Sequence, residues 1–249
     1  MLSKLKTVAR DLTYRFPANV RCNICDWTGR RFDSDNWHPH TVCWRCSSEV
    51  RHRLLMAALL SHPQLSRDRL CRDKRVLHFA PEPQLLNVLK ASAKKYVTAN
   101  YAAPADMNLD MTNMPEVPAE AFDLVVACDV LEHVSSDRAA LKEIRRILTK
   151  GGWAILTVPQ KDGLADTFED PTVVDPAERE RVFGQFDHLR IYGQSFPRIL
   201  ESEGFEPIVI DETSFPSAVV RKNVLFPPVL SSHPLATNYR KVFFARKPS

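Results

Sequence analysis

The sequence has little glycine and no long apolar run. Only 7 of its 249 residues are glycine, and residues 80–83 read Ala-Pro-Glu-Pro where a nucleotide-binding turn commonly carries glycines. No stretch approaches the roughly 18–20 apolar residues that span a bilayer. Residues 1–16 also lack the apolar core of about 7–15 residues that a secretory signal needs. We therefore expect a cytoplasmic protein with no membrane-spanning helix.

Lysine runs and repeats of aromatic with basic residues are also absent, although the charge is unevenly distributed. Residues 1–75 hold 15 lysines and arginines against 7 acidic residues, whereas residues 76–249 hold 19 against 23. A basic front part is joined to a mildly acidic remainder, so the charge distribution is compatible with an anionic partner such as nucleic acid. Apolar residues at positions 2, 5, 8 and 12 predict a short amphipathic helix within residues 1–19, which either packs on the protein or rests on a membrane surface.

Four of the six cysteines form two C-x2-C pairs, CNIC and CWRC. Seventeen residues separate the pairs, within the window of about 15–20 that is typical of a four-cysteine zinc site. Each pair lets one tight turn deliver two sulfur atoms to the same ion. The spacing predicts a closed, structural zinc site formed by Cys22, Cys25, Cys43 and Cys46. His38 and His40 lie between the pairs as spare ligands or, as we favour, in surface or packing roles.

A predicted helix follows the second cysteine pair over residues 49–61 and ends before Pro63. Its first turn carries Arg51, His52 and Arg53 next to the predicted zinc site. These side chains either contact an anionic group of a substrate or line a solvated face, and we favour the solvated face. Cys71 and Cys128 lie outside the pairs and are predicted to be free thiols, with Cys128 in a strand.

From residue 75 onward, apolar strands alternate with amphipathic helices. The pattern predicts strands at residues 74–80, 95–101, 122–130, 153–159, 206–212 and 241–247 and helices at 83–93, 136–152 and 195–205. Ser136 is the expected N-cap of the second of these helices and Gly151 its C-terminal stop. Such alternation predicts an α/β fold with a mostly parallel sheet and helices on both faces. A ligand in this kind of sheet sits at the carboxyl ends of the strands.

Residues 121–159, AFDLVVACDVLEHVSSDRAALKEIRRILTKGGWAILTVP, resemble the second half of a class I S-adenosylmethionine-dependent methyltransferase. The segments CWRCSSEVRHRLL, VLHFAPEP and RERVFGQFDHLRIYG extend the resemblance to a group of bacterial methyltransferases with a front cysteine module. The resemblance implies a Rossmann-like sheet of seven strands, mostly parallel with the last antiparallel, preceded by a small zinc-knuckle module. The expected organisation is an N-terminal helix (1–19), a zinc module with a linker helix (20–72) and a methyltransferase domain (73–249).

The same resemblance implies where S-adenosylmethionine would bind. The first strand-to-helix turn would hold the methionine part, the second strand end the ribose, the LDM segment the adenine, and the end of the strand at residues 122–130 the sulfonium. The corresponding residues are His78, Ala80, Glu82, Gln84, Asn100, Asp110, Met111, Cys128 and Asp129. Pro81 and Pro83 remove two backbone donors from the turn, so Glu82 is expected to pair with the ammonium group of the cofactor. Asn100 stands where an acidic residue usually holds the ribose.

Asp129, Glu132 and His133 have the i, i+3, i+4 spacing that can face one pocket. Some O-methyltransferases with a similar segment bind a divalent metal there, and His188 can complete such a site. In many class I enzymes the same segment only forms the wall of the cofactor pocket. We favour His133 as a general base, with His188 as its competitor, because histidine titrates near neutral pH.

Two long segments, near residues 160–194 and 213–238, exceed simple connections and are expected to cover the substrate. In the first, Arg190 and Tyr192 are candidate substrate-binding residues. The alternative is that residues 188–193 anchor the insertion to the edge of the sheet.

The fourth predicted strand ends in Thr-Val-Pro-Gln, residues 157–160, and lacks the Asn/Asp-Pro-Pro-Tyr/Phe motif of adenine and glutamine N-methyltransferases. We therefore expect O- or amine N-methylation of a small molecule or glycan intermediate. One alternative is an RNA methyltransferase whose basic zinc module binds phosphates. Another is a non-catalytic scaffold of the same fold that binds a protein partner through the zinc module.

Overall fold

The computed structural model describes residues 19–249. The predicted N-terminal amphipathic helix therefore lies almost wholly outside the described residues. Within them, no helix is both long and apolar enough to cross a membrane.

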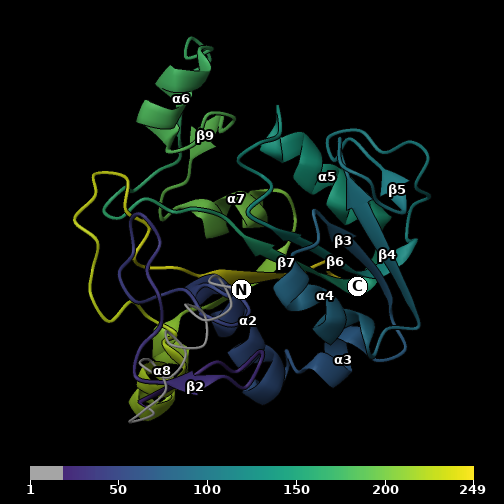
Figure 1. Cartoon of the computed structure of the whole chain (residues 1–249). Coiled ribbons are helices and arrows are strands. Elements are labelled where there is room, and N and C mark those ends of the chain that lie inside the picture. Colours follow the sequence, from purple (N-terminus) through teal and green to yellow (C-terminus); the bar gives the residue numbers. More distant parts are fainter. Residues whose placement is uncertain (1–18) are drawn as a thin grey trace, which may run out of the picture.

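Seven strands form one mixed sheet in the order β10-β11-β7-β6-β3-β4-β5 (Figure 1). Their bounds are β3 Arg75–Phe79, β4 Lys95–Asn100, β5 Met107–Asn108, β6 Phe122–Cys128, β7 Leu148–Thr157, β10 Glu206–Ile210 and β11 Val242–Arg246. The pairs from β7 to β5 are parallel, and β11 runs antiparallel to both of its neighbours. The predicted Rossmann-like sheet of seven strands with its last strand antiparallel is confirmed.

Helices cover both faces of the sheet (Figure 1). One face is covered by α5 Asp137–Ile147 and α7 Phe196–Ser202, and the other by α2 Val50–Ser61, α3 Arg67–Cys71 and α4 Pro83–Lys90. Successive residues of β6 are buried on alternate faces: Val125 packs toward α5 and α7, whereas Leu124 and Val126 pack toward the other helices. This two-sided burial explains the near-continuous apolar sequence of β6.

The α5 helix begins as predicted, with the Ser136 hydroxyl accepting a hydrogen bond from the backbone N–H of Ala139. It ends at Ile147, four residues before Gly151. The expectation that Gly151 stops this helix is wrong, because the chain turns directly into β7 at Leu148 and Gly151 lies inside that strand with φ +73°.

Two further segments flank the sheet at its carboxyl edge. The first insertion contains β8 Phe168–Glu169, α6 Pro176–Phe183 and β9 Arg190–Ile191, and α6 projects from the body of the molecule (Figure 1). The cysteine module contains β1 Val20–Arg21 and β2 Thr28–Gly29 and contacts α8 Ser217–Asn223 of the second insertion. A short 3-10 helix, η1 Glu212–Ser214, precedes α8.

The α2 helix is covered on more than one face, because it lies between the cysteine module and the sheet. His52 is 2% exposed and Arg53 is 0% exposed, so the favoured solvated-face interpretation of this turn is wrong. The Arg53 guanidinium donates to the carbonyls of Thr41 and Ser48 in the module. It also donates to the carbonyl of Asn223 at the end of α8, at 2.9 Å. Arg53 therefore joins the module, α2 and the second insertion.

Ala80, directly after β3, has φ +42°, in the left-handed region that favours glycine. Its N–H donates to the carbonyl of Ala99 at 2.8 Å, which holds the turn against β4. The turn thus keeps a glycine-like backbone although its residue is alanine.

We expect Ala80→Gly to raise the free energy of unfolding by about 0.5–1 kcal/mol, because relief of the left-handed strain exceeds the added chain entropy of glycine. Urea denaturation measures the change. Ala91→Gly is the matched control, since Ala91 has φ −59° at the end of α4 and should lose about 0.5–1 kcal/mol. Equal destabilisation by both changes would contradict the strained turn.

Candidate functional site

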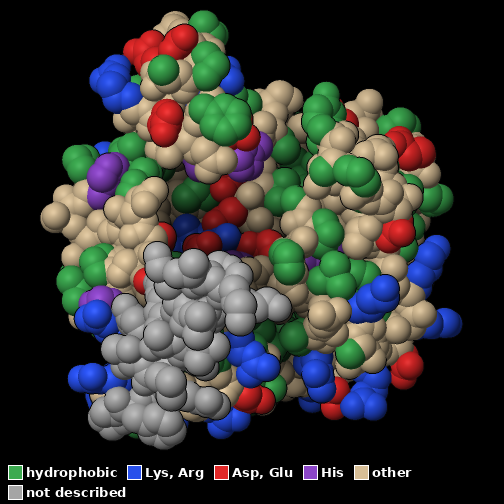
Figure 2. Space-filling view, viewed as in Figure 1, with side chains coloured by type: hydrophobic (Ala, Val, Ile, Leu, Met, Phe, Trp, Pro, Cys, Tyr) green, Lys and Arg blue, Asp and Glu red, His purple; other side chains and the backbone are tan. Residues whose placement is uncertain are grey.

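A cleft of about 660 Å³ opens at the carboxyl ends of β3, β4 and β6, within the volume range of about 300–1,000 Å³ that is usual for small-molecule sites. Its lining includes Phe79, Ala80, Asn100, Tyr101, Leu109, Asp110, Met111, Asp129, Val130, His133, Asp187 and Leu189. Figure 2 shows a hollow with acidic and basic side chains at its bottom and histidine on its wall below the α6 insertion. The cleft occupies the place that the strand order predicts for a ligand.

One end of the cleft combines an apolar wall with two polar side chains. Met111 is buried in the core beside this wall. The Asn100 side-chain oxygen accepts hydrogen bonds from the N–H groups of Ala102 and Ala103, at 3.2 and 3.1 Å, which leaves its amide nitrogen as the group that can donate to a ligand. The Asp110 side chain uses one oxygen to accept from Thr112, so its second oxygen is the one that can accept from a ligand.

Ala80 alone, among the four predicted cofactor residues of the turn after β3, lines the cleft. His78 points to the other face of the sheet, where its Nδ1 lies 2.6 Å from the Tyr96 hydroxyl, and burial lowers its pKa to about 4. Gln84 donates to the carbonyls of Cys46 and Ser47 in the cysteine module. The alternation of side chains along β3 explains the position of His78.

Glu82 and Asp129 are joined by the guanidinium of Arg51. Arg51 lies 2.8 Å from a Glu82 oxygen and 3.1 Å from an Asp129 oxygen. Glu82 also contacts His52 at 2.6 Å, and its second oxygen is buried without a hydrogen-bond partner. Arg51 was predicted to lie on a solvated face or to contact a substrate anion, and its contacts to these two carboxylates were not predicted.

Asp129 has a second guanidinium partner that sequence reasoning missed. Arg240 contacts both oxygens of Asp129, at 2.7 and 2.8 Å, and the Thr157 hydroxyl donates to one of them at 2.7 Å. Burial would raise the pKa of Asp129, but Arg240 and Arg51 hold it well below its ordinary range. Asp129 is therefore an ionised carboxylate at the floor of the cleft.

Cys128, the preceding residue, packs in the core on the α2 side of the sheet. Burial raises the pKa of its thiol well above the ordinary value. Cys128 and Cys71 are both buried free thiols, as predicted.

Glu132, His133 and His188 gather beside the cleft, with one ligand-type atom of each within 4.8 Å of the others. Of the three, His133 lines the cleft. The two imidazole rings lie 4.7 Å apart in an edge-to-face arrangement. His133 Nδ1 lies 3.1 Å from the Asp187 carboxylate, and His188 Nδ1 lies 3.2 Å from the Phe183 carbonyl. Burial raises the pKa of Glu132 well above its usual value and lowers that of His188.

Arg190 and Tyr192, predicted to bind substrate, do not line the cleft. Arg190 donates to the carbonyls of Leu131 and Val134, each at 2.7 Å, and the Tyr192 hydroxyl donates to Asp137 at 3.1 Å. Both side chains are buried. These contacts favour the alternative in which the segment anchors the insertion to the sheet.

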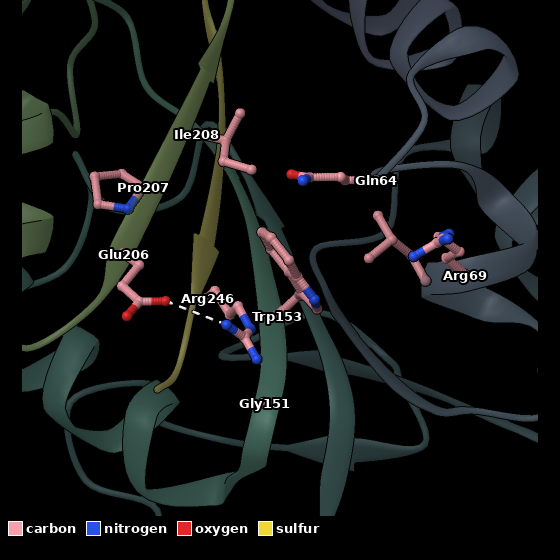
Figure 3. Close-up of a pocket in the computed structure, with 9 residues that line it drawn as sticks. Gln64, Arg69, Gly151, Trp153, Glu206, Pro207, Ile208 and Arg246 are labelled. Carbon is pink, nitrogen blue, oxygen red and sulfur yellow. Dashed lines mark hydrogen bonds and ion pairs between the residues drawn. The ribbon is translucent and has the colours of Figure 1, made fainter. Parts of the chain in front are cut away.

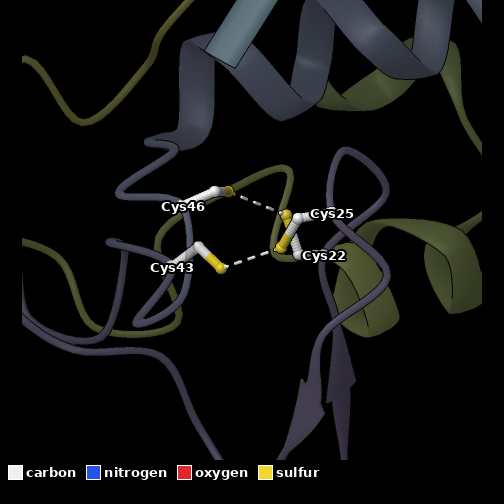
Figure 4. Close-up of side chains that lie close together, drawn as sticks. All are labelled: Cys22, Cys25, Cys43 and Cys46. Carbon is white, nitrogen blue, oxygen red and sulfur yellow. Dashed lines mark hydrogen bonds between the residues drawn. The ribbon is translucent and has the colours of Figure 1, made fainter. Parts of the chain in front are cut away.

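The four predicted zinc ligands form one cluster (Figure 4). Cys22 Sγ lies 3.7 Å from Cys46 Sγ, and Cys25 Sγ lies 3.7 Å from Cys43 Sγ. A tetrahedral ion with Zn–S bonds of about 2.3 Å separates its sulfur atoms by about 3.8 Å, so the cluster fits zinc. His38 and His40 do not belong to the cluster, and His38 contacts Asp35 instead.

A second cavity, of about 560 Å³, lies at the opposite edge of the sheet, near the start of β10 and the end of β11 (Figure 3). Trp153 and Ile208 form its apolar wall, and Arg246 is paired with Glu206 at 3.4 Å. The amino ends of parallel strands are not the usual ligand site of this architecture. The cleft is therefore the candidate functional site.

The order of the strands and the cleft at their carboxyl ends define a class I methyltransferase fold. Residues 62–156 match the family described as "Methyltransferase domain". No curated protein matches the chain.

Solved structures share the fold at low sequence identity. A candidate methyltransferase from Bacillus halodurans is 19% identical, with 80% of this chain and 99% of that chain covered and a TM-score of 0.50. The YcgJ protein from Bacillus subtilis is 14% identical, with the same coverage and a TM-score of 0.50. The cyclase SpnF is 18% identical, with 88% of this chain and 86% of that chain covered and a TM-score of 0.52.

Proposed function

We propose that the protein is an S-adenosylmethionine-dependent methyltransferase that methylates an oxygen or an amine of a small molecule or glycan intermediate. The observation that carries the proposal is the cleft at the carboxyl ends of β3, β4 and β6, with His133 in its wall and the His188 ring packed against His133. A cleft of about 660 Å³ has room for a cofactor and a small acceptor side by side.

Polar groups in and beside the cleft fit four parts of S-adenosylmethionine. The Asp110 oxygen suits the amino group of adenine, with Met111 beside the ring, and the Asn100 amide suits the ribose hydroxyls. Glu82 lies outside the cleft lining, but its oxygen without a partner suits the ammonium group. The carboxylate of the cofactor would be held by Arg51, since the Gln84 amide is used in contacts to the cysteine module.

S-adenosylmethionine, when bound, supplies a methyl group on a sulfonium, which an acceptor lone pair displaces to leave S-adenosylhomocysteine. The chain must hold the acceptor in line and remove its proton. We propose that His133 marks the acceptor end of the cleft, with His188 packed behind it, and that the proton leaves there. Arg190, in this proposal, positions these residues from behind and does not touch the substrate.

We further propose that Cys22, Cys25, Cys43 and Cys46 hold a structural zinc ion, because the sulfur separations fit a tetrahedron and all four ligands are cysteines. The zinc would fix the turns that carry the carbonyls bonded by Arg53 and Gln84.

Isothermal titration calorimetry with S-adenosylmethionine tests the cofactor site. We expect wild-type protein to bind with a dissociation constant of about 1 μM to 1 mM, and Asp110→Ala to weaken binding at least about 10-fold, since it removes a hydrogen bond acceptor. Glu116→Ala is the matched control, because Glu116 is an exposed carboxylate of the same connection that does not line the cleft. Unchanged binding by Asp110→Ala would refute the adenine placement.

Binding of S-adenosylmethionine does not by itself show catalysis, because one fold hosts many reactions. Methyl transfer to an acceptor therefore needs an assay of its own. Complete absence of S-adenosylmethionine binding would favour the non-catalytic scaffold. The RNA alternative gains no support, since Arg51 and Arg53 of the basic front part are used in internal contacts. RNA binding that weakens steeply with rising salt would revive it.

A further inference from the structure

A carboxylate and two imidazoles lie together beside the cleft, and one of them, His133, lines it. Glu132 and His133 follow β6, whereas His188 comes from the insertion between α6 and β9. One ligand-type atom from each lies within 4.8 Å of the other two. We infer that Glu132, His133 and His188 form a binding site for a divalent transition-metal ion.

The hydrogen bonds of the two imidazoles determine which nitrogen is available. A carbonyl oxygen only accepts hydrogen bonds, so His188 Nδ1, at 3.2 Å from the Phe183 carbonyl, carries the proton. An ionised carboxylate also only accepts, so His133 Nδ1, at 3.1 Å from Asp187, carries the proton as well. Each ring then has its lone pair on Nε2. Metal-binding histidines characteristically donate their other N–H to a carboxylate or a carbonyl in this way.

Glu132 supplies the second argument. Its side chain is 1% exposed, and its Oε2 atom is buried without a hydrogen-bond partner. Burial of a carboxyl oxygen without a partner is costly, and a cation held jointly with the two Nε2 atoms would compensate that cost. Two imidazoles and one carboxylate suit ions from Mn²⁺ to Zn²⁺ in the first transition row.

The two segments that bring these ligands are fixed to each other by the backbone. The N–H of Leu189 donates to the carbonyl of Glu132 at 2.9 Å. Arg190, in turn, donates to the carbonyls on either side of the Glu132–His133 pair, those of Leu131 and Val134. The ligand positions are therefore held before any ion arrives, which lowers the cost of binding.

The site lies beside the cleft, so its effect on chemistry rests on the proposed function. An acceptor hydroxyl bound to a divalent cation has a lower pKa than a free one. With both Nε2 atoms on the ion, the cation would take the place of a histidine base: the acceptor oxygen would lose its proton to water and be a stronger nucleophile near neutral pH. Binding of the ion itself does not depend on that role.

Binding of Mn²⁺ followed by electron paramagnetic resonance tests the inference without any cofactor. Mn²⁺ prefers nitrogen and oxygen ligands over thiolates, so protein with zinc in the cysteine cluster reports on the proposed site. We expect the wild type to take up one equivalent. Glu132→Gln and His188→Gln should each weaken binding by more than about 10-fold, and Asp187→Asn by about 10–100-fold. His233→Gln, at an exposed histidine stacked on Trp37, should leave it unchanged.

Circular dichroism checks that each variant is folded. The Asp187 side chain is 44% exposed, so Asp187→Asn is expected to fold even if a substitution at a buried ligand does not. The inference is overturned if the wild type takes up no Mn²⁺, or if Glu132→Gln and Asp187→Asn bind it as tightly as the wild type. Titration of the same sample with S-adenosylmethionine separates the two proposals: Mn²⁺ binding without cofactor binding supports the metal site and refutes the methyltransferase.

Discussion

Replacement of Arg51 by methionine is expected to lower the free energy of unfolding by about 3–5 kcal/mol at neutral pH. The Arg51 side chain is 15% exposed and lies between the carboxylates of Glu82 and Asp129. Methionine keeps much of the apolar stem but removes the cation, so two buried carboxylates lose a shared partner. Removal of one member of a buried ionic network costs more than the network contributes as a whole, because the remaining charges are left unpaired.

The loss should depend on pH in a defined direction. Burial would raise the pKa of Asp129, but Arg240 and Arg51 hold it well below the unfolded value of about 3.9. A lowered carboxyl pKa stabilises the folded state above the unfolded pKa, and this stabilisation is lost as the pH falls toward the folded pKa. The effect of Arg51→Met should therefore be largest above about pH 5 and smaller near pH 3.

Urea denaturation at several pH values measures both effects. Arg30→Met is the matched control, because Arg30 is an exposed arginine of the neighbouring cysteine module and should change stability by less than about 0.5 kcal/mol. An equal loss for Arg51→Met at pH 3 and pH 7 would show that packing, and not the ion pairs, is responsible.

The sheet could be predicted because its signals are local. Six of the seven strands contain a short apolar segment, and the two-sided burial of β6 leaves a continuous apolar sequence that periodicity detects. The exception is β5, whose two residues Met107–Asn108 carry no such pattern. The cysteine cluster could be predicted equally well, since its two pairs have a fixed spacing, and the structure brings all four sulfur atoms together. Both features depend on neighbours in the sequence.

The contacts of the site could not be predicted, because they join residues distant in the chain. Asp129 and Arg240 are separated by 111 positions, and no local pattern marks Arg240 as the partner. The direction of His78 depends on which face of β3 it occupies, and an apolar strand buried on both faces does not reveal this. The prediction that Arg51 lies on a solvated face was wrong for a related reason. A helical turn rich in charged residues indicates exposure to solvent unless its buried partners are known.

Removal of zinc from the cysteine cluster is expected to lower the melting temperature by at least about 10 °C. Structural zinc contributes about 10–16 kcal/mol to the folding of zinc-finger peptides. The module here also packs on α8 and α2, so part of its structure has other support. A loss of about 4 kcal/mol would still shift the melting temperature of a chain of this size by about 10 °C.

Differential scanning calorimetry with and without a chelator measures this shift, and atomic emission should find one zinc ion per chain. Cys43→Ser should lose the zinc and reproduce the effect of chelation. Cys71→Ala is the matched control, because Cys71 is a buried thiol outside the cluster, and it should keep both the zinc and most of the stability. A Cys43→Ser protein that melts with the wild type would refute a structural zinc site.

The effect of zinc should extend to the cofactor cleft through α2. The Arg53 guanidinium bonds the carbonyls of Thr41 and Ser48, which flank Cys43 and Cys46, and Arg51 in the same helical turn reaches Asp129 at the floor of the cleft. If zinc holds those carbonyls in place, then its loss frees the turn that carries Arg51. We expect Cys43→Ser to weaken S-adenosylmethionine binding at least about 10-fold, since Arg51 would no longer hold its charge near the cofactor carboxylate. Unchanged cofactor affinity in zinc-free protein would mean that the module and the cleft act independently.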